Sequence, residues 1–128
     1  MGVFKEPEKP RVLVIEDDRT VRRMIRASVK EDCNLVVAGN ANLGMSLFRN
    51  IQPHIIFLDI MLPDSNGHEL LSAMMSANSD AFIVMMSGLS DNDNVFRAVE
   101  TGAKGFISKP FNEDKMRFFI EKSVQHKH

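Results

Sequence analysis

Four apolar runs in this sequence each end in a side chain that can take part in phosphate chemistry. One run ends in Asp59, and an earlier one leads into Glu16 and Asp17. Two later runs end in Ser87 and in Lys109. If these runs are parallel strands, their carboxyl ends meet at one edge of a sheet, where such sheets bind ligands. Carboxylates, a hydroxyl and an amine gathered there would form a pocket for phosphoryl transfer.

Each of these residue types suits one part of that chemistry. Crowded carboxylates of Glu16, Asp17 and Asp59 would repel one another unless a cation neutralised them. A hard divalent ion with oxygen ligands fits, so we expect Mg²⁺ or Mn²⁺. Lys109 would hold phosphoryl oxygens, and Ser87 would donate a hydrogen bond to them. Asp59 is the expected nucleophile, because carboxylates form acyl phosphates without needing a general base.

Taken singly, none of these residues is a strong signal. An Asp at a strand end is more often a turn former or a helix cap. A Lys before Pro is usually a solvated surface residue, and a Ser at a strand end is usually a cap. Their joint occurrence at four strand ends of one alternating pattern favours a functional site.

The elements that must position these residues alternate along the chain. Apolar runs predict strands at 11–16, 34–38, 54–59, 81–86 and 105–108. Apolar stripes of the intervening helices comprise Val21, Met24, Ile25, Ser28, Val29; Leu43, Leu47, Phe48, Ile51; Leu70, Leu71, Met74, Met75; Val95, Phe96, Val99; and Met116, Phe119, Ile120, Val124. Five strand–helix units predict an α/β fold, a doubly wound five-stranded parallel sheet in the flavodoxin-like order 2-1-3-4-5.

Several residues mark helix ends. Asp18 is free to cap the first helix, and Asn112 suits the start of the last one. Ser90 with Asp93 three residues later has the form of a capping box before the fourth helix. Gly102 can end that helix.

Composition is that of one soluble domain. The chain has 128 residues, a net charge of −1 and one cysteine, Cys33, which excludes an internal disulfide. This charge does not favour nucleic acid or an anionic membrane. No apolar stretch approaches a membrane span, and a cytoplasmic location is expected. We expect a flexible lead at 1–10, one domain at 11–125 and a frayed end at 126–128.

The ordered set of motifs resembles the receiver domain of two-component response regulators. The resemblance extends over about residues 11–124 and includes the receivers of the chemotaxis-regulator type. The motifs that carry the resemblance are VIEDD at 14–18, LDIMLPD at 58–64 with Gly67, MSG at 86–88 and GAKGFISKPF at 102–111.

The resemblance implies a phosphoacceptor switch. Asp59 would accept a phosphoryl group from a histidine kinase or a histidine phosphotransfer protein. Asp17, Asp59 and the backbone carbonyl of Met61 would bind the metal directly, while Glu16 would act mostly through water. The alternative acidic pair, Asp17 with Asp18, is less favoured because Asp18 is needed as the helix cap.

The resemblance also assigns the residues that read the phosphoryl group. Lys109 would pair with it and with Asp59, and the Lys109–Pro110 peptide would be cis. Ser87 would bond the phosphoryl oxygen and move toward it, and Phe106 would swing inward as the aromatic switch. Bulky Met61 and Leu89 would hinder the attacking water and so lengthen the phosphoryl lifetime.

Phe118 departs from the apolar stripe of the last helix and is expected on its outer side. The resemblance places it on the partner face formed by the fourth helix, the fifth strand and the fifth helix. There it would dock a downstream protein target or a second receiver.

Two other function classes compete with this interpretation. A metal-dependent phosphohydrolase with an aspartyl nucleophile expects a second Asp two residues after the first, where Met61 stands. A flavodoxin-type cofactor binder expects a Gly-rich loop after the first strand, which the sequence lacks. We therefore expect a switch that assists its own phosphorylation rather than an enzyme acting on an external substrate.

Overall fold

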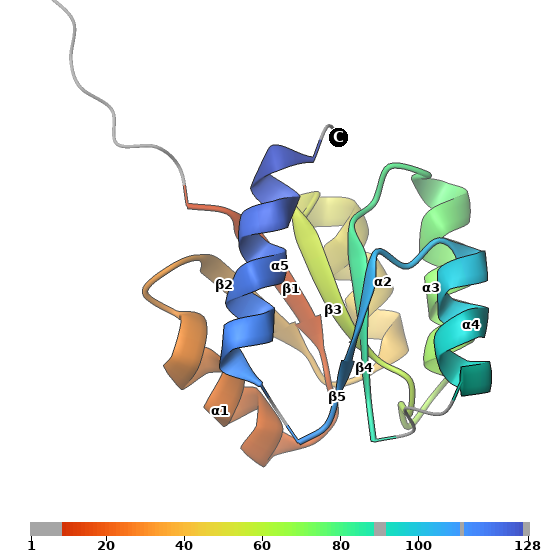
Figure 1. Cartoon of the computed structure of the whole chain (residues 1–128), viewed down its shortest axis with the longest axis horizontal. Helices are drawn as coiled ribbons and strands as arrows, with labels where there is room; N and C mark the ends of the chain where they lie inside the picture. Colours follow the sequence, from red (N-terminus) through yellow and green to blue (C-terminus); the bar gives the residue numbers. More distant parts are fainter. Residues whose placement is uncertain (1–8, 89–91, 111, 127–128) are drawn as a thin grey trace, which may run out of the picture.

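The computed structural model describes residues 9–88, 92–110 and 112–126, and Figure 1 shows their arrangement. The strands are β1 Arg11–Ile15, β2 Asn34–Ala38, β3 Ile55–Asp59, β4 Ile83–Ser87 and β5 Gly105–Ser108. The helices of the described residues are α1 Arg19–Val29, α2 Ala41–Ile51, α3 Gly67–Ala77, α4 Asn92–Thr101 and α5 Glu113–Gln125.

All strand pairs are parallel, and the order is β2-β1-β3-β4-β5. The predicted doubly wound α/β fold is therefore confirmed. The main difference lies in β4, which begins at Ile83 and includes Ser87. Ala81 comes earlier because its backbone N–H donates to the carbonyl of Asn78 in a turn (3.1 Å).

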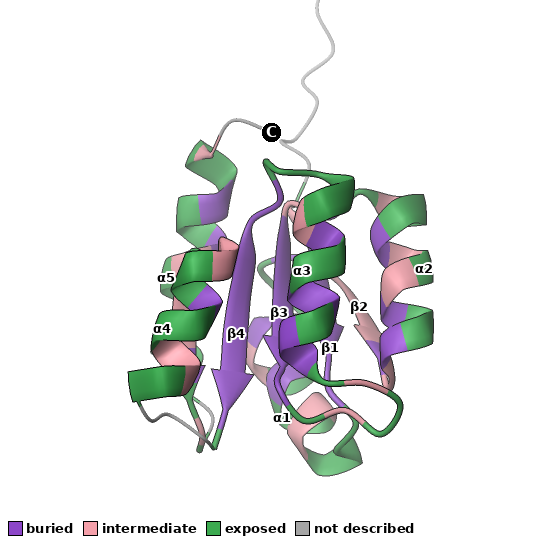
Figure 2. Ribbon diagram, turned by 90° about the vertical axis from the view of Figure 1, so that its right-hand side faces the viewer, coloured by how far each residue is buried: buried purple, intermediate pink, exposed green. Residues whose placement is uncertain are grey.

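Helices cover both faces of the sheet, and alternate strand residues serve the two faces. One core cluster joins Leu13, Ile56 and Met85 to residues of α2, α3 and α4. The other joins Val14 and Phe57 to residues of α1 and α5. Figure 2 shows the result, with buried strands between helices whose outer surfaces are exposed. Because strands β3 and β4 are buried on both faces, their sequences read as continuous apolar runs.

The helix stripes predicted from the sequence are partly wrong. Met24, Leu43, Phe96, Val99 and Val124 are exposed. In α2 the helix packs closely at Gly44, where an added Cβ would lie 2.6 Å from Ile15 Cδ1, and this contact turns Leu43 outward. In α5 the inward position is taken by Ser123, whose hydroxyl donates to the Ile120 carbonyl (2.6 Å).

The predicted helix ends agree with the structure where it describes them. Asp18 accepts hydrogen bonds from the backbone N–H groups of Thr20 and Val21 at the start of α1. Asn112 caps α5 in the same way. Gly102 follows α4 with φ +121°, a conformation that only glycine adopts without strain. The proposed Ser90 cap lies outside the described residues.

The two ends of the chain were assigned to a flexible lead and a frayed tail. Residues 1–8 and 127–128 lie outside the described part. His126 is described, and its Nε2 lies 2.9 Å from the Asp80 carbonyl oxygen while its ring meets Phe82 edge-on. Within the described residues, no helix is both long and apolar enough to cross a membrane.

Candidate functional site

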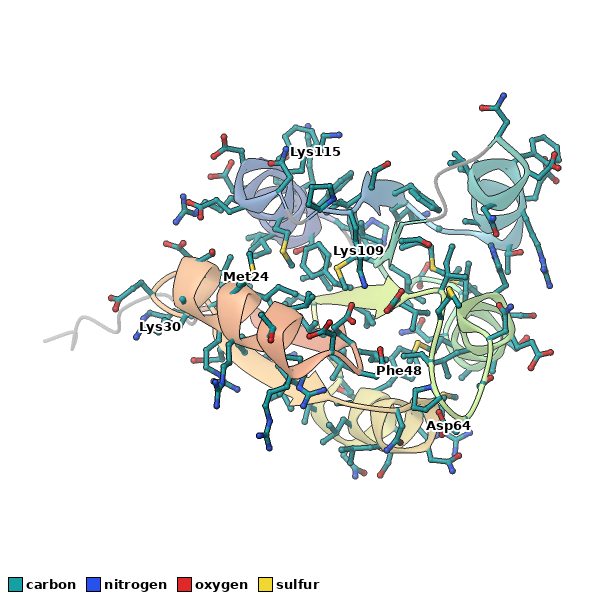
Figure 3. The ribbon with its side chains drawn as sticks, turned by 90° about the horizontal axis from the view of Figure 1, so that it is seen from below. Met24, Lys30, Phe48, Asp64, Lys109 and Lys115 are labelled. Carbon is teal, nitrogen blue, oxygen red and sulfur yellow. The ribbon has the colours of Figure 1, made fainter. Side chains whose placement is uncertain are left out.

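Three carboxylates meet at the carboxyl edge of the sheet. Asp59 is the last residue of β3, and Glu16 and Asp17 follow β1, which lies beside β3. Carboxylate oxygens of the three residues lie within 4.8 Å of one another. Figure 3 views the molecule from this edge. Parallel pairing of adjacent strands thus brings together acids that are 43 positions apart in the sequence, from Glu16 to Asp59.

Lys109 follows the edge strand β5, and its side chain reaches across the end of β4 to the two buried acids. Its Nζ lies 3.1 Å from Asp59 Oδ2 and 2.8 Å from Glu16 Oε2. The backbone N–H of Lys109 donates to the carbonyl of Ser87 (2.8 Å), which ties the residue after β5 to the end of β4. The Lys109–Pro110 peptide is cis, as expected.

This group holds three carboxyl groups and one amine, so their pKa values depend on one another. Burial raises the pKa of the Glu16 carboxyl, and the charge of Asp59 raises it further, against the opposing effect of Lys109. Burial alone would lower the pKa of Lys109, but its close contacts with Glu16 and Asp59 outweigh burial and raise it. The ammonium group is therefore held in its charged form by the two carboxylates that it contacts.

One oxygen of this cluster lacks a hydrogen bond. Glu16 is fully buried, and its Oε2 has no hydrogen-bond donor among the described residues. Its nearest partner is Lys109 Nζ, an ionic contact at 2.8 Å with an ammonium group that Asp59 shares. The other oxygen, Oε1, accepts from the backbone N–H of Asp18 (3.2 Å). A buried carboxylate oxygen in this condition favours an additional cation or water nearby.

The loop from β3 to α3 passes close beneath Asp59. The backbone N–H of Met61 donates to Asp59 Oδ1 (3.3 Å). Gly67 packs so tightly that an added Cβ would overlap the backbone carbonyl of Asp59, so this position accepts no side chain. Asp64 fastens the outer part of the loop to α2, accepting from the backbone N–H groups of Ala41 (2.7 Å) and Asn42 (3.0 Å).

These residues surround a cavity of about 530 Å³ that opens at the edge of the sheet. Ser87 lies in its wall and is buried. The lining consists of Glu16, Asp17, Asp18, Asp59, Met61, Ser87, Gly88 and Lys109. Every acid, the hydroxyl and the amine expected from the sequence therefore line one space.

The donor set fits a hard divalent cation. Its oxygens are carboxylate oxygens, which Mg²⁺ and Mn²⁺ prefer. The buried Glu16 Oε2 without a hydrogen bond points to the same need for positive charge. Asp18 does not belong to the group of three clustered acids, because its carboxylate caps α1.

Two of the predicted residues, Phe106 and Phe118, do not line this cavity. Phe106 is half-buried in β5 and packs against the cluster under α2, α3 and α4. Phe118 is 51% exposed on α5, where it meets Phe119 edge-on and has Lys122 Nζ 5.5 Å from its ring centre. Leu89 lies outside the described residues.

Sequence reasoning missed three supporting contacts. Asp64 caps α2 from 23 positions away. Arg22 bonds the carbonyls of Glu16 and Asp17. His68, buried in α3, has Nε2 2.8 Å from Asn94 Oδ1 of α4. No pattern of residue types and spacing in the sequence predicts any of these contacts.

The whole arrangement matches a known family. Residues 12–121 match the response regulator receiver domain. The chain belongs to this family. Its members are receivers of two-component systems and act as signalling switches rather than as conventional enzymes.

Two curated relatives, one of similar length and one longer, support the assignment. The chain is 31% identical over 118 residues to the chemotaxis protein CheY of Listeria monocytogenes, covering 90% of this chain and 98% of that protein. It is 30% identical over 120 residues to the probable C4-dicarboxylate response regulator DctR of Bacillus subtilis, where the match covers 91% of this chain but 53% of that protein.

Solved structures share the fold. The receiver domain of the Francisella response regulator 1452 superimposes with a TM-score of 0.86, at 23% identity, over 91% of this chain and 98% of that one. A CheY-like receiver domain protein from Methanospirillum hungatei gives a TM-score of 0.83 at 23% identity, over 92% and 98% of the two chains.

Proposed function

We propose that this receiver is a phosphoacceptor switch in which Asp59 takes a phosphoryl group in a reaction that depends on Mg²⁺. The observation that carries the proposal is the position of Lys109 Nζ, 3.1 Å from Asp59 Oδ2 and 2.8 Å from Glu16 Oε2. A half-buried ammonium group between two buried carboxylates is a costly arrangement for stability alone. It is useful where an anionic group must be received and held.

In the proposed reaction, a carboxylate oxygen of Asp59 attacks phosphorus, the new O–P bond forms and the donor's bond to phosphorus breaks. The donor is a phosphohistidine of a histidine kinase or of a phosphotransfer protein. Lys109 neutralises charge on the phosphoryl oxygens, and the hydroxyl of Ser87 donates to one of them. Because Asp59 attacks as a carboxylate, the chain needs no base to activate it.

Asp17, Asp59 and the Met61 carbonyl would hold the metal, with Glu16 acting through water. When bound, Mg²⁺ supplies positive charge that offsets the repulsion between the carboxylates and the incoming phosphoryl group. The clustering of acid oxygens within 4.8 Å supports this assignment.

Intact mass spectrometry tests the proposal. The protein is incubated with Mg²⁺ and a small acyl-phosphate donor, and the expected product carries one phosphoryl group. Asp59→Ala should give no adduct, and chelation of Mg²⁺ should suppress the adduct in the parent. An adduct of equal yield on Asp59→Ala would refute the assignment of the acceptor.

The output of the switch is proposed to pass through the surface formed by α4, β5 and α5. Helices α4 and α5 both contact β5. Exposed Phe96, Val99 and Phe118 supply apolar area to this surface, with Phe106 half-buried in β5. This composition supports docking of a downstream protein or of a second receiver after phosphorylation.

Phe118→Ala tests the docking surface. It should weaken phosphorylation-dependent self-association or target binding by about tenfold, as expected when an aromatic anchor is removed. Leu43→Ala is the matched control, since Leu43 is 46% exposed and belongs to α2. Equal binding by the parent and Phe118→Ala would remove Phe118 from the surface.

A further inference from the structure

Arg22 makes an unusual contact with the backbone that carries two of the acids. Its Nη1 donates to the carbonyl oxygens of both Glu16 and Asp17, each at 2.8 Å. The side chain comes from the first turns of α1 and folds back over the start of its own helix. One guanidinium nitrogen thus uses both of its hydrogens on the segment that leads from β1 to α1.

This contact decides the position of Asp17. The Glu16 backbone is already fixed, because its N–H donates to the Ala38 carbonyl (2.9 Å). Asp17 is exposed, and within the described residues its sole hydrogen bond is the one from Arg22 to its carbonyl. Removing the guanidinium would therefore leave the Asp17 backbone free to rotate and its carboxylate free to leave the cluster.

The surroundings of Arg22 accommodate this geometry. An added Cβ at Gly39 would lie 3.3 Å from Arg22 Nη1, tighter than an ordinary contact, so glycine leaves the guanidinium its room. The positive charge also lies beside a segment bearing three consecutive acids, Glu16, Asp17 and Asp18, and reduces their mutual repulsion.

We infer that Arg22 is a positioning residue for the divalent cation, holding the Glu16–Asp17 backbone so that the Asp17 carboxylate stays within reach of Asp59. The inference rests on the proposed function and adds the residue that sets its metal affinity. Arg22 does not line the cavity and so has no expected contact with the phosphoryl group.

The test is calorimetric titration with Mg²⁺ alone, in the absence of any phosphodonor. Arg22→Met should bind Mg²⁺ about tenfold more weakly than the parent, the usual loss when a group that orients a metal ligand is removed. Arg23→Met is the matched control, because Arg23 is the next residue and carries the same charge, but is exposed where Arg22 is half-buried. It should bind as the parent does.

Phosphorylation kinetics separate positioning from a general structural role. At saturating Mg²⁺ the rate of Arg22→Met should return to within about twofold of the parent, because only the Mg²⁺ requirement has changed. Arg22→Lys keeps the charge without the paired bonds, so it should remain weaker than the parent. Parent-like Mg²⁺ affinity in Arg22→Lys would show that charge alone acts and would overturn positioning.

If Arg22→Met fails to fold, Gly39→Ala tests the same contact while keeping the arginine. Its Cβ should press on the guanidinium and weaken Mg²⁺ binding in the same direction, and unchanged affinity would count against the inference. A parent that neither binds Mg²⁺ nor accepts a phosphoryl group would refute the proposed function instead. A parent that binds, with Arg22→Met equal to it, would refute only the role of Arg22.

Discussion

The two edges of the sheet hold polar side chains of different kinds and satisfy them in different ways. At the carboxyl edge, charged side chains face one another: Lys109 meets Glu16 and Asp59. At the amino edge, the backbone satisfies the polar side chains. Arg11 donates from Nε to the Ile51 carbonyl (3.0 Å), and its backbone N–H donates to His54 Nδ1 (2.9 Å).

Cavity size does not tell the two edges apart. The cavity at the amino edge has about 570 Å³, slightly more than the 530 Å³ at the carboxyl edge. Its described lining includes Arg11, Arg49 and His54 but no acid. The group of acids around an ammonium, and not volume, identifies the functional edge, because of these two cavities only the one at the carboxyl edge is lined by acids.

The largest expected difference between the edges concerns phosphorylation. Lys109→Gln should slow phosphoryl uptake from a small donor about 100-fold, since it removes the group that neutralises charge in the transition state. Arg11→Gln should leave the rate unchanged. The measurement is the initial rate of adduct formation at saturating Mg²⁺. Similar rates for the two variants would erase the proposed distinction between the edges.

Stability should fall in both variants, and further at the carboxyl edge. Arg11→Gln should lower the free energy of unfolding by about 1 kcal/mol, because charged hydrogen bonds to the carbonyls of Ile51 and Gln52 at the end of α2 are lost. Lys109→Gln should lower it by about 2 kcal/mol, because it leaves the buried carboxylates of Glu16 and Asp59 without their counter-ion. Urea unfolding of both variants measures this; a smaller loss in Lys109→Gln than in Arg11→Gln would contradict it.

Met61 offers a finer test of the carboxyl edge. This residue is 65% exposed at the cavity, where it can block water from the phosphoryl group. Met61→Asn should shorten the phosphoryl lifetime about fivefold, equal to one hydrogen bond of about 1 kcal/mol to the attacking water. Adding Leu89→Glu should shorten it further.

Decay of the adduct after removal of the donor gives the lifetime. Leu43→Asn is the control for a polar substitution at an exposed apolar site on α2. An unchanged lifetime in Met61→Asn, with or without Leu89→Glu, would discard the shielding role.

The smallest effect is expected near the amino edge at Cys33. Burial, aided by the charge of Asp32, raises the pKa of this thiol from 9.0 to about 11. The folded state therefore favours the neutral thiol, whose Sγ donates to the Val29 carbonyl (3.3 Å). Its contribution to stability is complete below pH 9 and is lost as pH rises toward 11.

The Cys33→Ala variant isolates that contribution. The difference in unfolding free energy between the parent and Cys33→Ala should shrink from pH 8 to pH 11, as other groups titrate alike in both proteins. A difference that stayed constant over this interval would show that the thiol is not held neutral by the fold.

Sequence reasoning predicted the sheet order and the members of the site for one physical reason. Parallel strands place their carboxyl ends at one edge, so strand-end residues such as Asp59 and Lys109 must converge. Helix caps such as Asp18 depend on neighbouring residues in the sequence, so they are equally predictable. The outward turn of Leu43 is not, because it depends on the close contact of Gly44 with Ile15.

Two contacts of polar side chains with the backbone are also not predictable from the sequence. Asp64 caps α2, a helix that begins 23 positions before it, and Arg22 folds back onto carbonyls rather than onto an acid. Both contacts depend on the three-dimensional path of the loops, and residue type and spacing do not determine that path.

Locating the phosphoryl group is the most direct test of the central claim. Borohydride reduction converts a phosphorylated aspartate to homoserine, and peptide mass mapping then identifies the modified residue. We predict homoserine at position 59 alone, after incubation with Mg²⁺ and a phosphodonor. Modification at Asp17, Glu16 or any other residue, with Asp59 unchanged, would contradict the account.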